Sequence, residues 1–369
     1  MSMTPATPAM VAPGGTIGIL GGGQLGRMLA LAAARLGLRC HIYSDTDPAP
    51  AFDVAHARTH ASYEDRAALA RFAEACDAVT YEFENVPATA AEVLGAHKPT
   101  HPNARALAIA QDRLEEKRFI ASLGLATAPF APVSSRTEAG AAFKQIGKER
   151  AVLKTRRFGY DGKGQVMVAS AQEAEEAFAR LGAPCILEGF VPFAFEASVI
   201  AARARDGQFA AYDPPENRHA EHILRRSIVP GQLSEAQGRA AKEIAGRIAA
   251  AFEYVGVLGV ELFVTQTGEL VVNEIAPRVH NSGHWTLEAC LVSQFEQHIR
   301  AVAGWPLGNP ARHSDAVMDN LIGTEAEAWR KLAAGEGALH LYGKDEARPG
   351  RKMGHVTFLS PRSTPPRCS

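Results

Sequence analysis

The order of strand-like and helical segments predicts an α/β protein whose first part is a parallel sheet. A buried-strand pattern over Thr16–Leu20 passes through a glycine-rich turn into a helical run over 27–37. A second strand ends near Asp45, and a helical segment over 63–76 leads into a third strand over 77–84. Strands that alternate with helices in this way are expected to lie parallel, with the helices as crossover connections.

A proline-containing break over 97–104 predicts the first domain boundary near residue 105. The elements expected beyond it, in chain order, are a helix over 111–124, strands over 151–155 and 165–170, a helix over 234–254, a helix from about Thr286 to Val302 and a hairpin within 337–360.

Composition excludes several classes of protein. The 369 residues suffice for two or three domains, and a net charge of −1 with a pI near 6.9 argues against a nucleic-acid or anionic-membrane binder. No uncharged apolar stretch reaches the ~18 residues that span a bilayer, and the first residues lack a signal-peptide pattern. The five cysteines are scattered and show no CxxC pair, so we expect reduced thiols in a soluble, cytoplasmic protein.

The first glycine-rich turn has the GxGxxG spacing at Gly21, Gly23 and Gly26. Between a strand and a helix, such glycines let the backbone approach an anion at the helix N-terminus. Asp45 ends the next strand, where a nicotinamide-binding fold holds a ribose, so this motif alone suggests a dehydrogenase. A purely structural turn is the alternative.

A second glycine-rich loop, RRFGYDGKGQ over 156–165, is basic. Lys154 precedes it and Lys163 lies within it, so it has the flexibility and charge of a segment that closes over a polyphosphate. A solvated hairpin loop with ordinary surface charges is the alternative.

The segment GVELFVTQTGELVVNE predicts a carboxylate pair. If Thr267 and Gly268 form a two-residue hairpin loop, Glu261 lies directly opposite Glu274. Opposed side chains on one sheet face have Cβ atoms roughly 4.5–5.5 Å apart, and two carboxylates so placed call for a cation such as magnesium. Two exposed glutamates on a sheet edge are the alternative.

Two polar blocks follow this hairpin. NEIAPRVHNSGHWT carries Arg278, whose planar fork suits a carboxylate or phosphate, and His280, a candidate proton carrier. GKDEARPGRKMGHV carries Lys344 and Arg351 in a short turn that would suit a phosphate clamp or, equally, solvent.

The blocks GGGQLGRM, YEFENV, QDRLEEK, FGYDGKGQ, LEGFVPF, ENRHAEHIL, GVELF, NEIAPRVHNSGHWT and RPGRKMGHV occur in one order between Thr16 and Leu359. Together they resemble the ATP-grasp superfamily and, within it, the 5-(carboxyamino)imidazole ribonucleotide synthetase family of purine biosynthesis. Phe158 departs from the likeness, because many members have a glycine there.

The resemblance implies an N-terminal Rossmann-like domain, a central ATP-grasp domain and a small C-terminal β-containing region. The expected division is a disordered tail over 1–14 and domains over 15–105, 106–305 (with a lid subdomain at about 120–190) and 306–369. The implied activity is the ATP- and magnesium-dependent carboxylation of aminoimidazole ribonucleotide by bicarbonate, through carboxyphosphate, in a homodimer.

The likeness also implies roles for individual residues. The residues expected to bind ATP are Arg113, Lys154, Gly159, Tyr160, Asp161, Gly162, Lys163, Gly164, Gln165, Glu188, Gly189, Phe190, Val191, Glu196, His219, Asn273 and Glu274. Those expected to bind the ribonucleotide are Gly22, Gly23, Gln24, Leu25, Glu82, Asn85, Tyr160, Asp161, Arg278, His280, Asn281, Lys344 and Arg351. Magnesium would bind Glu261 and Glu274, and the catalytic groups would be Arg278, His280, Asp161 and Lys344.

Three other functions compete with this one. A formate-using ribonucleotide transformylase would share the glutamate pair, and a nicotinamide oxidoreductase would use the GxGxxG loop. A non-enzymatic nucleotide sensor would keep the fold without the chemistry.

Overall fold

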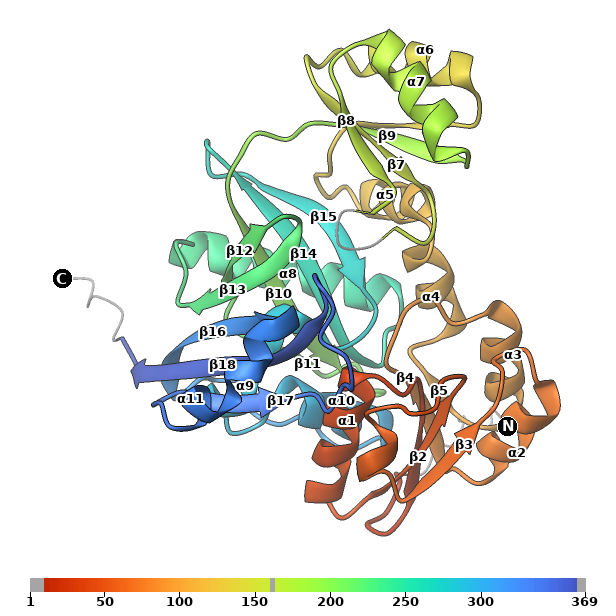
Figure 1. Ribbon diagram of the computed structural model, residues 1–369, viewed down its shortest axis with the longest axis vertical. Helices are drawn as coiled ribbons and strands as arrows, with labels where there is room; N and C mark the ends of the chain where they lie inside the picture. Colours follow the sequence, from red (N-terminus) through yellow and green to blue (C-terminus); the bar gives the residue numbers. More distant parts are fainter. Residues whose placement is uncertain (1–9, 160–162, 364–369) are drawn as a thin grey trace, which may run out of the picture.

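A computed structural model describes residues 10–159 and 163–363 of the chain. These residues form three sheets. Figure 1 shows the sheet of residues 130–189 at the top and the other two below it, partly beside each other. The predicted α/β class is confirmed.

The first sheet is parallel throughout and has the strand order β3-β2-β1-β4-β5, as the alternating pattern predicted. Its strands are β1 (Thr16–Leu20), β2 (Arg39–Ser44), β3 (Ala57–His60), β4 (Ala78–Tyr81) and β5 (Thr100–His101), with the helices α1 (Gln24–Arg35), α2 (Arg66–Glu74) and α3 (Ala88–His97) and the short η1 (Phe52–Val54). The break expected over 97–104 therefore contains the edge strand of this sheet. The boundary near residue 105 stays a prediction.

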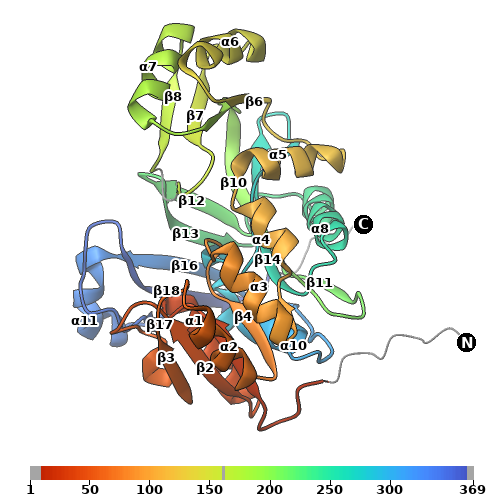
Figure 2. The same cartoon turned by 90° about the vertical axis from the view of Figure 1, so that its right-hand side faces the viewer.

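Two helices, α4 (Ala104–Ala110) and α5 (Arg113–Ser122), lead to a four-stranded antiparallel sheet, which we call the lid sheet. Its strands are β6 (Phe130–Val133), β7 (Ala151–Thr155), β8 (Gln165–Val168) and β9 (Cys185–Gly189), and its helices are α6 (Arg136–Ile146) and α7 (Ala171–Leu181). Figure 2 shows the lid sheet and its two helices standing above the remainder of the molecule.

The third sheet has nine strands and carries the C-terminal strands on one side. Its elements are β10 (Phe193–Arg203), β11 (Phe209–Ala211), β12 (Glu216–Ala220), β13 (Ile223–Val229), α8 (Glu235–Ala251), β14 (Gly256–Thr265), β15 (Leu270–Ala276), η2 (Asn281–Gly283), α9 (Thr286–Ala289), α10 (Gln294–Val302), β16 (Ser314–Ile322), η3 (Gly323–Ala328), α11 (Trp329–Ala333), β17 (Ala338–Leu341) and β18 (Lys352–Pro361). The predicted C-terminal hairpin is the β17–β18 pair. Because β16 also pairs with β13, this hairpin extends the central sheet.

The single helix expected over 286–302 is wrong. It is divided into α9 and α10, because Cys290 forms a bridge with Arg312 and Ser293 starts a new helix by accepting a hydrogen bond from the backbone N–H of Glu296. Cap residues such as serine compete with a continuing helix in this way.

The turn expected at Thr267 and Gly268 is also wrong, although the carboxylate pairing it predicted is confirmed. The backbone N–H of Thr265 donates to Glu269 O, so the loop has three residues instead of two. Next to the loop, each residue of β14 therefore pairs with the β15 residue one position earlier than expected, as Val264 does with Leu270. A β-bulge next to Glu261 adds one residue on β15 and so returns the pairing to the expected register, in which Glu261 pairs with Glu274.

The four cysteines of the described residues are buried and unpaired, as expected. Among these residues, no helix combines the length and apolar character needed to cross a bilayer.

Candidate active site

A cavity of about 660 Å³ lies between the lid sheet and the nine-stranded sheet. It brings together, from segments far apart in the sequence, most of the residues expected to bind ATP and metal. Those that line it are Arg113, Lys154, Gly159, Gln165, Glu188, Phe190, Val191, Glu196, His219, Glu261, Asn273 and Glu274. Three residues expected to bind the ribonucleotide, Arg278, His280 and Asn281, line it too.

Glu261 and Glu274 face each other across β14 and β15 on the wall of this cavity. The charge of Glu261 and then burial raise the pKa of Glu274. Burial alone would raise the pKa of Glu261 as well, but the hydrogen bond from His280 lowers it to about 2. The Nε2 atom of His280 lies 3.1 Å from Glu261 Oε1. Two oxygen donors that repel each other in this way suit a divalent cation.

Two buried residues of α5, which the sequence analysis missed, hold the bulge between these carboxylates. Lys117 Nζ donates to Asn273 O at 2.6 Å, and Glu116 Oε1 accepts from the backbone N–H of Ile275 at 2.6 Å. Burial, reinforced by the charge of Glu274, raises the pKa of Glu116 to about 8. Glu116 and Lys117 therefore replace the hydrogen bonds between β14 and β15 that the bulge interrupts. In the sequence, only the family-like block QDRLEEK indicated that this segment has a functional role. No local pattern indicated that it contacts β15.

A row of alternating charges runs through the lid side of the cavity. Glu188 Oε2 lies 3.1 Å from Lys154 Nζ and 3.4 Å from Lys117 Nζ. Burial acts to raise the pKa of Glu188, but these two cations lower it to about 2. Its other oxygen, Oε1, is buried and has no hydrogen-bond partner within the described chain, so it can accept a bond from a ligand. The N–H groups of Gly189 and Phe190 already donate to the backbone.

Glu196 and His219 form the opposite wall, on neighbouring strands β10 and β12. His219 Nδ1 lies 2.7 Å from Glu196 Oε2. Burial acts to lower the pKa of His219, but the hydrogen bond and charge of Glu196 raise it overall. These two residues, both expected to bind ATP, are thus already paired with each other.

Two described residues of the basic loop, Gly159 and Gln165, line the cavity. Arg113 holds this loop by donating from Nη2 to Gly159 O at 3.0 Å and from Nη1 to Thr155 O at 3.3 Å. Phe158 has a φ of 62° and a side chain that is 75% exposed, which explains why glycine suits this position. The carbonyl of Gly164 accepts from the N–H of Thr155. The predicted Lys163 directly precedes Gly164. The predicted residues Tyr160, Asp161 and Gly162 lie outside the described residues.

Arg278 connects this cavity with a smaller one of about 60 Å³. Its Nε atom donates to the carboxylate of Glu84, a residue that was not singled out. Burial acts to raise the pKa of Glu84, but Arg278 lowers it to about 2. Gln111 fixes the loop that carries Glu84 by donating to the carbonyls of residues 84 and 86. The predicted Asn85 lies between them and is exposed at the small cavity.

The first glycine loop does not line either of these cavities, and its anion-binding position is taken. Glu82 accepts hydrogen bonds from the N–H groups of Gly23 and, at 2.6 Å, Gly26. A Cβ atom at Gly23 would meet Glu82 Oε1 at 2.6 Å, so this carboxylate needs a glycine there. The remaining predicted loop residues are Gly22, Gln24 and Leu25, of which Gln24 is the first residue of α1. With a carboxylate already at the start of α1, a dinucleotide pyrophosphate has no place in this arrangement.

The other predicted substrate residues have hydrogen-bond partners within the chain. Asn281 exchanges two amide hydrogen bonds with Asn320, at 2.8 and 2.9 Å. Lys344 Nζ donates to Lys352 O at 2.6 Å, and Arg351 donates to Glu346 O at 2.8 Å. Lys344 and Arg278 are both close enough to Glu82 to lower its pKa, although burial raises it overall.

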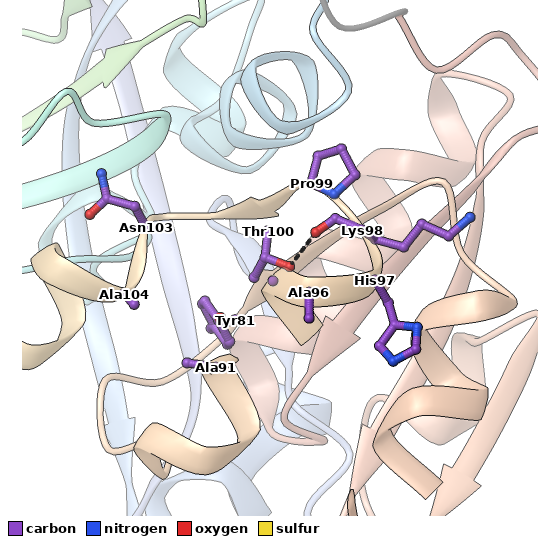
Figure 3. Close-up of a pocket in the computed structure, with 10 residues that line it drawn as sticks. Tyr81, Ala91, Ala96, His97, Lys98, Pro99, Thr100, Asn103 and Ala104 are labelled. Atoms are coloured by element: carbon purple, nitrogen blue, oxygen red, sulfur yellow. Dashed lines mark hydrogen bonds between the residues drawn. The ribbon is translucent and has the colours of Figure 1, made fainter. Parts of the chain in front are cut away.

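A third cavity, of about 470 Å³, lies beside β5 and the end of α3 (Figure 3). Its polar groups are largely used within the fold: Thr100 donates to Lys98 O, and Asn103 donates to Phe252 O and caps α4. It holds no opposed carboxylates, and so it is not the candidate active site.

The described residues contain no cluster of three or more histidine, cysteine or acidic side chains arranged to hold a metal. Glu261 and Glu274, whose carboxylates face each other on the cavity wall, would supply two protein ligands. Magnesium fits such a site, because it keeps several water and phosphate oxygens and needs few carboxylates.

Comparison with known proteins agrees with this geometry. The model of the ribonucleotide synthetase preATP-grasp domain matches residues 15–111, that of the ATP-grasp domain residues 118–295, and that of the phosphoribosylaminoimidazole carboxylase C-terminal domain residues 316–364. The N5-carboxyaminoimidazole ribonucleotide synthase of Brucella melitensis is 53% identical and covers 95% of this chain and 98% of its own.

Solved structures are similar along almost the whole chain. The ADP complex of an N5-carboxyaminoimidazole ribonucleotide synthetase superposes with a TM-score of 0.92 at 41% identity, covering 96% of this chain and 94% of the other. The Aspergillus clavatus synthase in complex with ADP and 5-aminoimidazole ribonucleotide gives 0.88 at 31% identity, covering 95% and 94%. This chain therefore belongs to the N5-carboxyaminoimidazole ribonucleotide synthase family, whose central part is an ATP-grasp domain.

Proposed function

We propose that this chain carboxylates 5-aminoimidazole ribonucleotide with bicarbonate at the expense of ATP, in purine biosynthesis. The observation that carries the proposal is the opposed pair Glu261 and Glu274 in a cavity whose other walls carry Lys154, Arg113 and Arg278. Carboxylates for a metal and cations for phosphates are what ATP-dependent phosphoryl transfer requires. A relative that matches 95% of this chain carries the synthase name.

The reaction would run in two steps. A bicarbonate oxygen forms a bond to the γ-phosphorus as the bond to ADP breaks, which gives carboxyphosphate. The amine nitrogen of the ribonucleotide then forms a bond to the carboxyl carbon, inorganic phosphate leaves, and the amine loses a proton. Positioning and charge neutralisation carry most of such a reaction, because phosphoryl transfer asks little covalent chemistry of the protein.

The residues of the chain would divide this work. Lys154 and Arg113 would hold phosphates, and the unpartnered Glu188 Oε1 would accept from the adenine amino group. Magnesium on Glu261 and Glu274 would neutralise charge on the transferred phosphate. Arg278 would orient bicarbonate, with its guanidinium held by Glu84.

The test is ADP release from ATP and magnesium, with and without aminoimidazole ribonucleotide, in bicarbonate-containing and bicarbonate-depleted buffer. Release that needs both compounds supports the proposal. Release that needs formate and another ribonucleotide would assign the chain to the transformylases, and release under neither condition would leave a nucleotide sensor.

We further propose that the chain acts as a cytoplasmic homodimer. The family resemblance supports the dimer, and the four unpaired buried thiols fit a reducing compartment. Light scattering on the purified protein at several concentrations tests the dimer, and a single mass equal to one chain would contradict it.

A further inference from the structure

A chain of buried polar side chains starts at His280 and crosses the nine-stranded sheet. His280 Nδ1 lies 2.8 Å from Ser282 Oγ, which lies 2.7 Å from Ser198 Oγ on β10. Asn217 Nδ2 on β12 donates to Ser198 Oγ at 2.9 Å, and Ser227 Oγ on β13 donates to Asn217 Oδ1 at 2.8 Å. The three serines are fully buried and Asn217 is 5% exposed, so water does not compete for these bonds.

The hydrogen bonds of this chain have one consistent direction. The Ser198–Ser282 bond and the bond between Ser282 and His280 Nδ1 could each be donated from either side, so the direction is set at His280 Nδ1. The backbone N–H of Ser282 points at the same nitrogen from 3.4 Å, and a backbone N–H can only donate. This donor leaves Nδ1 as an acceptor, so Ser282 Oγ donates to it, Ser198 Oγ donates to Ser282, and Asn217 donates to Ser198.

The other ring nitrogen faces an acceptor. His280 Nε2 lies 3.1 Å from Glu261 Oε1. A carboxylate accepts hydrogen bonds, and so Nε2 must carry the proton of the ring. The backbone of His280 is fixed as well, because Gln294 accepts from its N–H at 2.9 Å and donates to its carbonyl at 2.7 Å. The ring thus has little freedom to turn or to exchange its two nitrogens.

From this geometry we infer that His280 is held as its Nε2–H tautomer by Ser282, Ser198 and Asn217, and acts as a positioning residue that aims the carboxylate of Glu261. The inference rests on the proposed function only for the use of that carboxylate. It revises the role expected for His280, because a ring with Nε2–H against a carboxylate and Nδ1 against two donors has no nitrogen left to take a proton from the substrate amine. Metal-binding carboxylates are commonly oriented by such outer hydrogen bonds.

The first test identifies directly which ring nitrogen of His280 carries the proton. Nitrogen NMR of histidine-labelled protein distinguishes a bare ring nitrogen from a protonated one, and the resonances of His280 are those lost in His280→Asn among the 13 histidines. We expect a bare Nδ1 and a protonated Nε2. A protonated Nδ1 in the unmodified protein would overturn the inference without any variant.

The second test uses two matched variants. Ser282→Ala removes the donor to Nδ1, whereas Ser227→Ala removes an equally buried hydroxyl at the far end of the chain, four hydrogen bonds from the ring. We expect Ser282→Ala to mix the two tautomers and to raise the magnesium concentration that half-saturates ADP binding roughly 10-fold, as loss of an outer-shell partner does. Ser227→Ala should change both far less.

Equal effects of the two variants, or an unchanged ring in Ser282→Ala, would overturn the inference, because both outcomes describe a merely structural network. Neither readout requires carboxylation of the ribonucleotide. If the tautomer and the magnesium dependence behave as expected but no carboxylation occurs, only the proposed function fails.

Discussion

Replacing Lys117 by methionine should destabilise the protein strongly, although the new side chain keeps most of the volume. Lys117 is 1% exposed, and its ammonium contacts both Glu188 and the carbonyl of Asn273. Lowering the pKa of Glu188 from its ordinary value near 4.5 to about 2 corresponds to about 3 kcal/mol, shared between Lys117 and Lys154. An unsatisfied buried carbonyl at Asn273 adds about 1–3 kcal/mol. We expect a loss of about 3 kcal/mol, in line with the cost of removing one partner from a buried ion pair.

Urea unfolding followed by circular dichroism measures this loss, with Lys154→Met as the matched control. Lys154 also pairs with Glu188, but its side chain is 15% exposed. Of the two lysines, only Lys117 holds the bulge at Asn273. Both variants should weaken ADP binding, whereas Lys117→Met should lower the unfolding free energy clearly more. If the two variants unfold at the same urea concentration, the bulge does not depend on Lys117 and the reasoning is wrong.

Three further predictions concern single side chains. Glu274→Gln should abolish turnover without lowering the melting temperature, because it removes one of two repelling carboxylates; normal activity would refute the metal assignment. Glu84 has a pKa near 2 in the fold against an ordinary 4.5, so its contribution is complete above about pH 4.5 and disappears as the pH falls toward 2. Acid titration of Glu84→Gln should therefore show a flatter loss of stability than the unmodified protein, and parallel curves would contradict the Arg278–Glu84 pair. Phe158→Gly should melt no lower than Phe158→Ala, because alanine keeps the left-handed strain of about 1 kcal/mol that glycine lacks; the reverse order would exclude that strain.

Several features of this chain could be predicted because they depend on neighbours in the sequence. The parallel first sheet follows from alternating strand and helix patterns, and the β17–β18 hairpin from two extended segments around a glycine-bearing turn. The facing of Glu261 and Glu274 also follows from local alternation along two adjacent strands. The expected turn was one residue too short, and the bulge compensated for that error.

Other features were decided by contacts between distant residues. The bulge that keeps the carboxylates opposed is held from α5 by Glu116 and Lys117, more than 150 residues before β15. The anion site of the first glycine loop is taken by Glu82, which directly follows β4, although the loop by itself has the spacing of a phosphate-binding turn.

The role of His280 shows the same division. Its presence beside polar residues was visible in the sequence, but the nitrogen that carries its proton depends on Ser198 and Asn217, which lie more than 60 residues away in the chain. Local patterns determine which faces are buried and where strands begin and end, because neighbouring residues set backbone conformation. Only tertiary packing decides which buried donor meets which acceptor, because a buried polar group must find its partner wherever the fold places one.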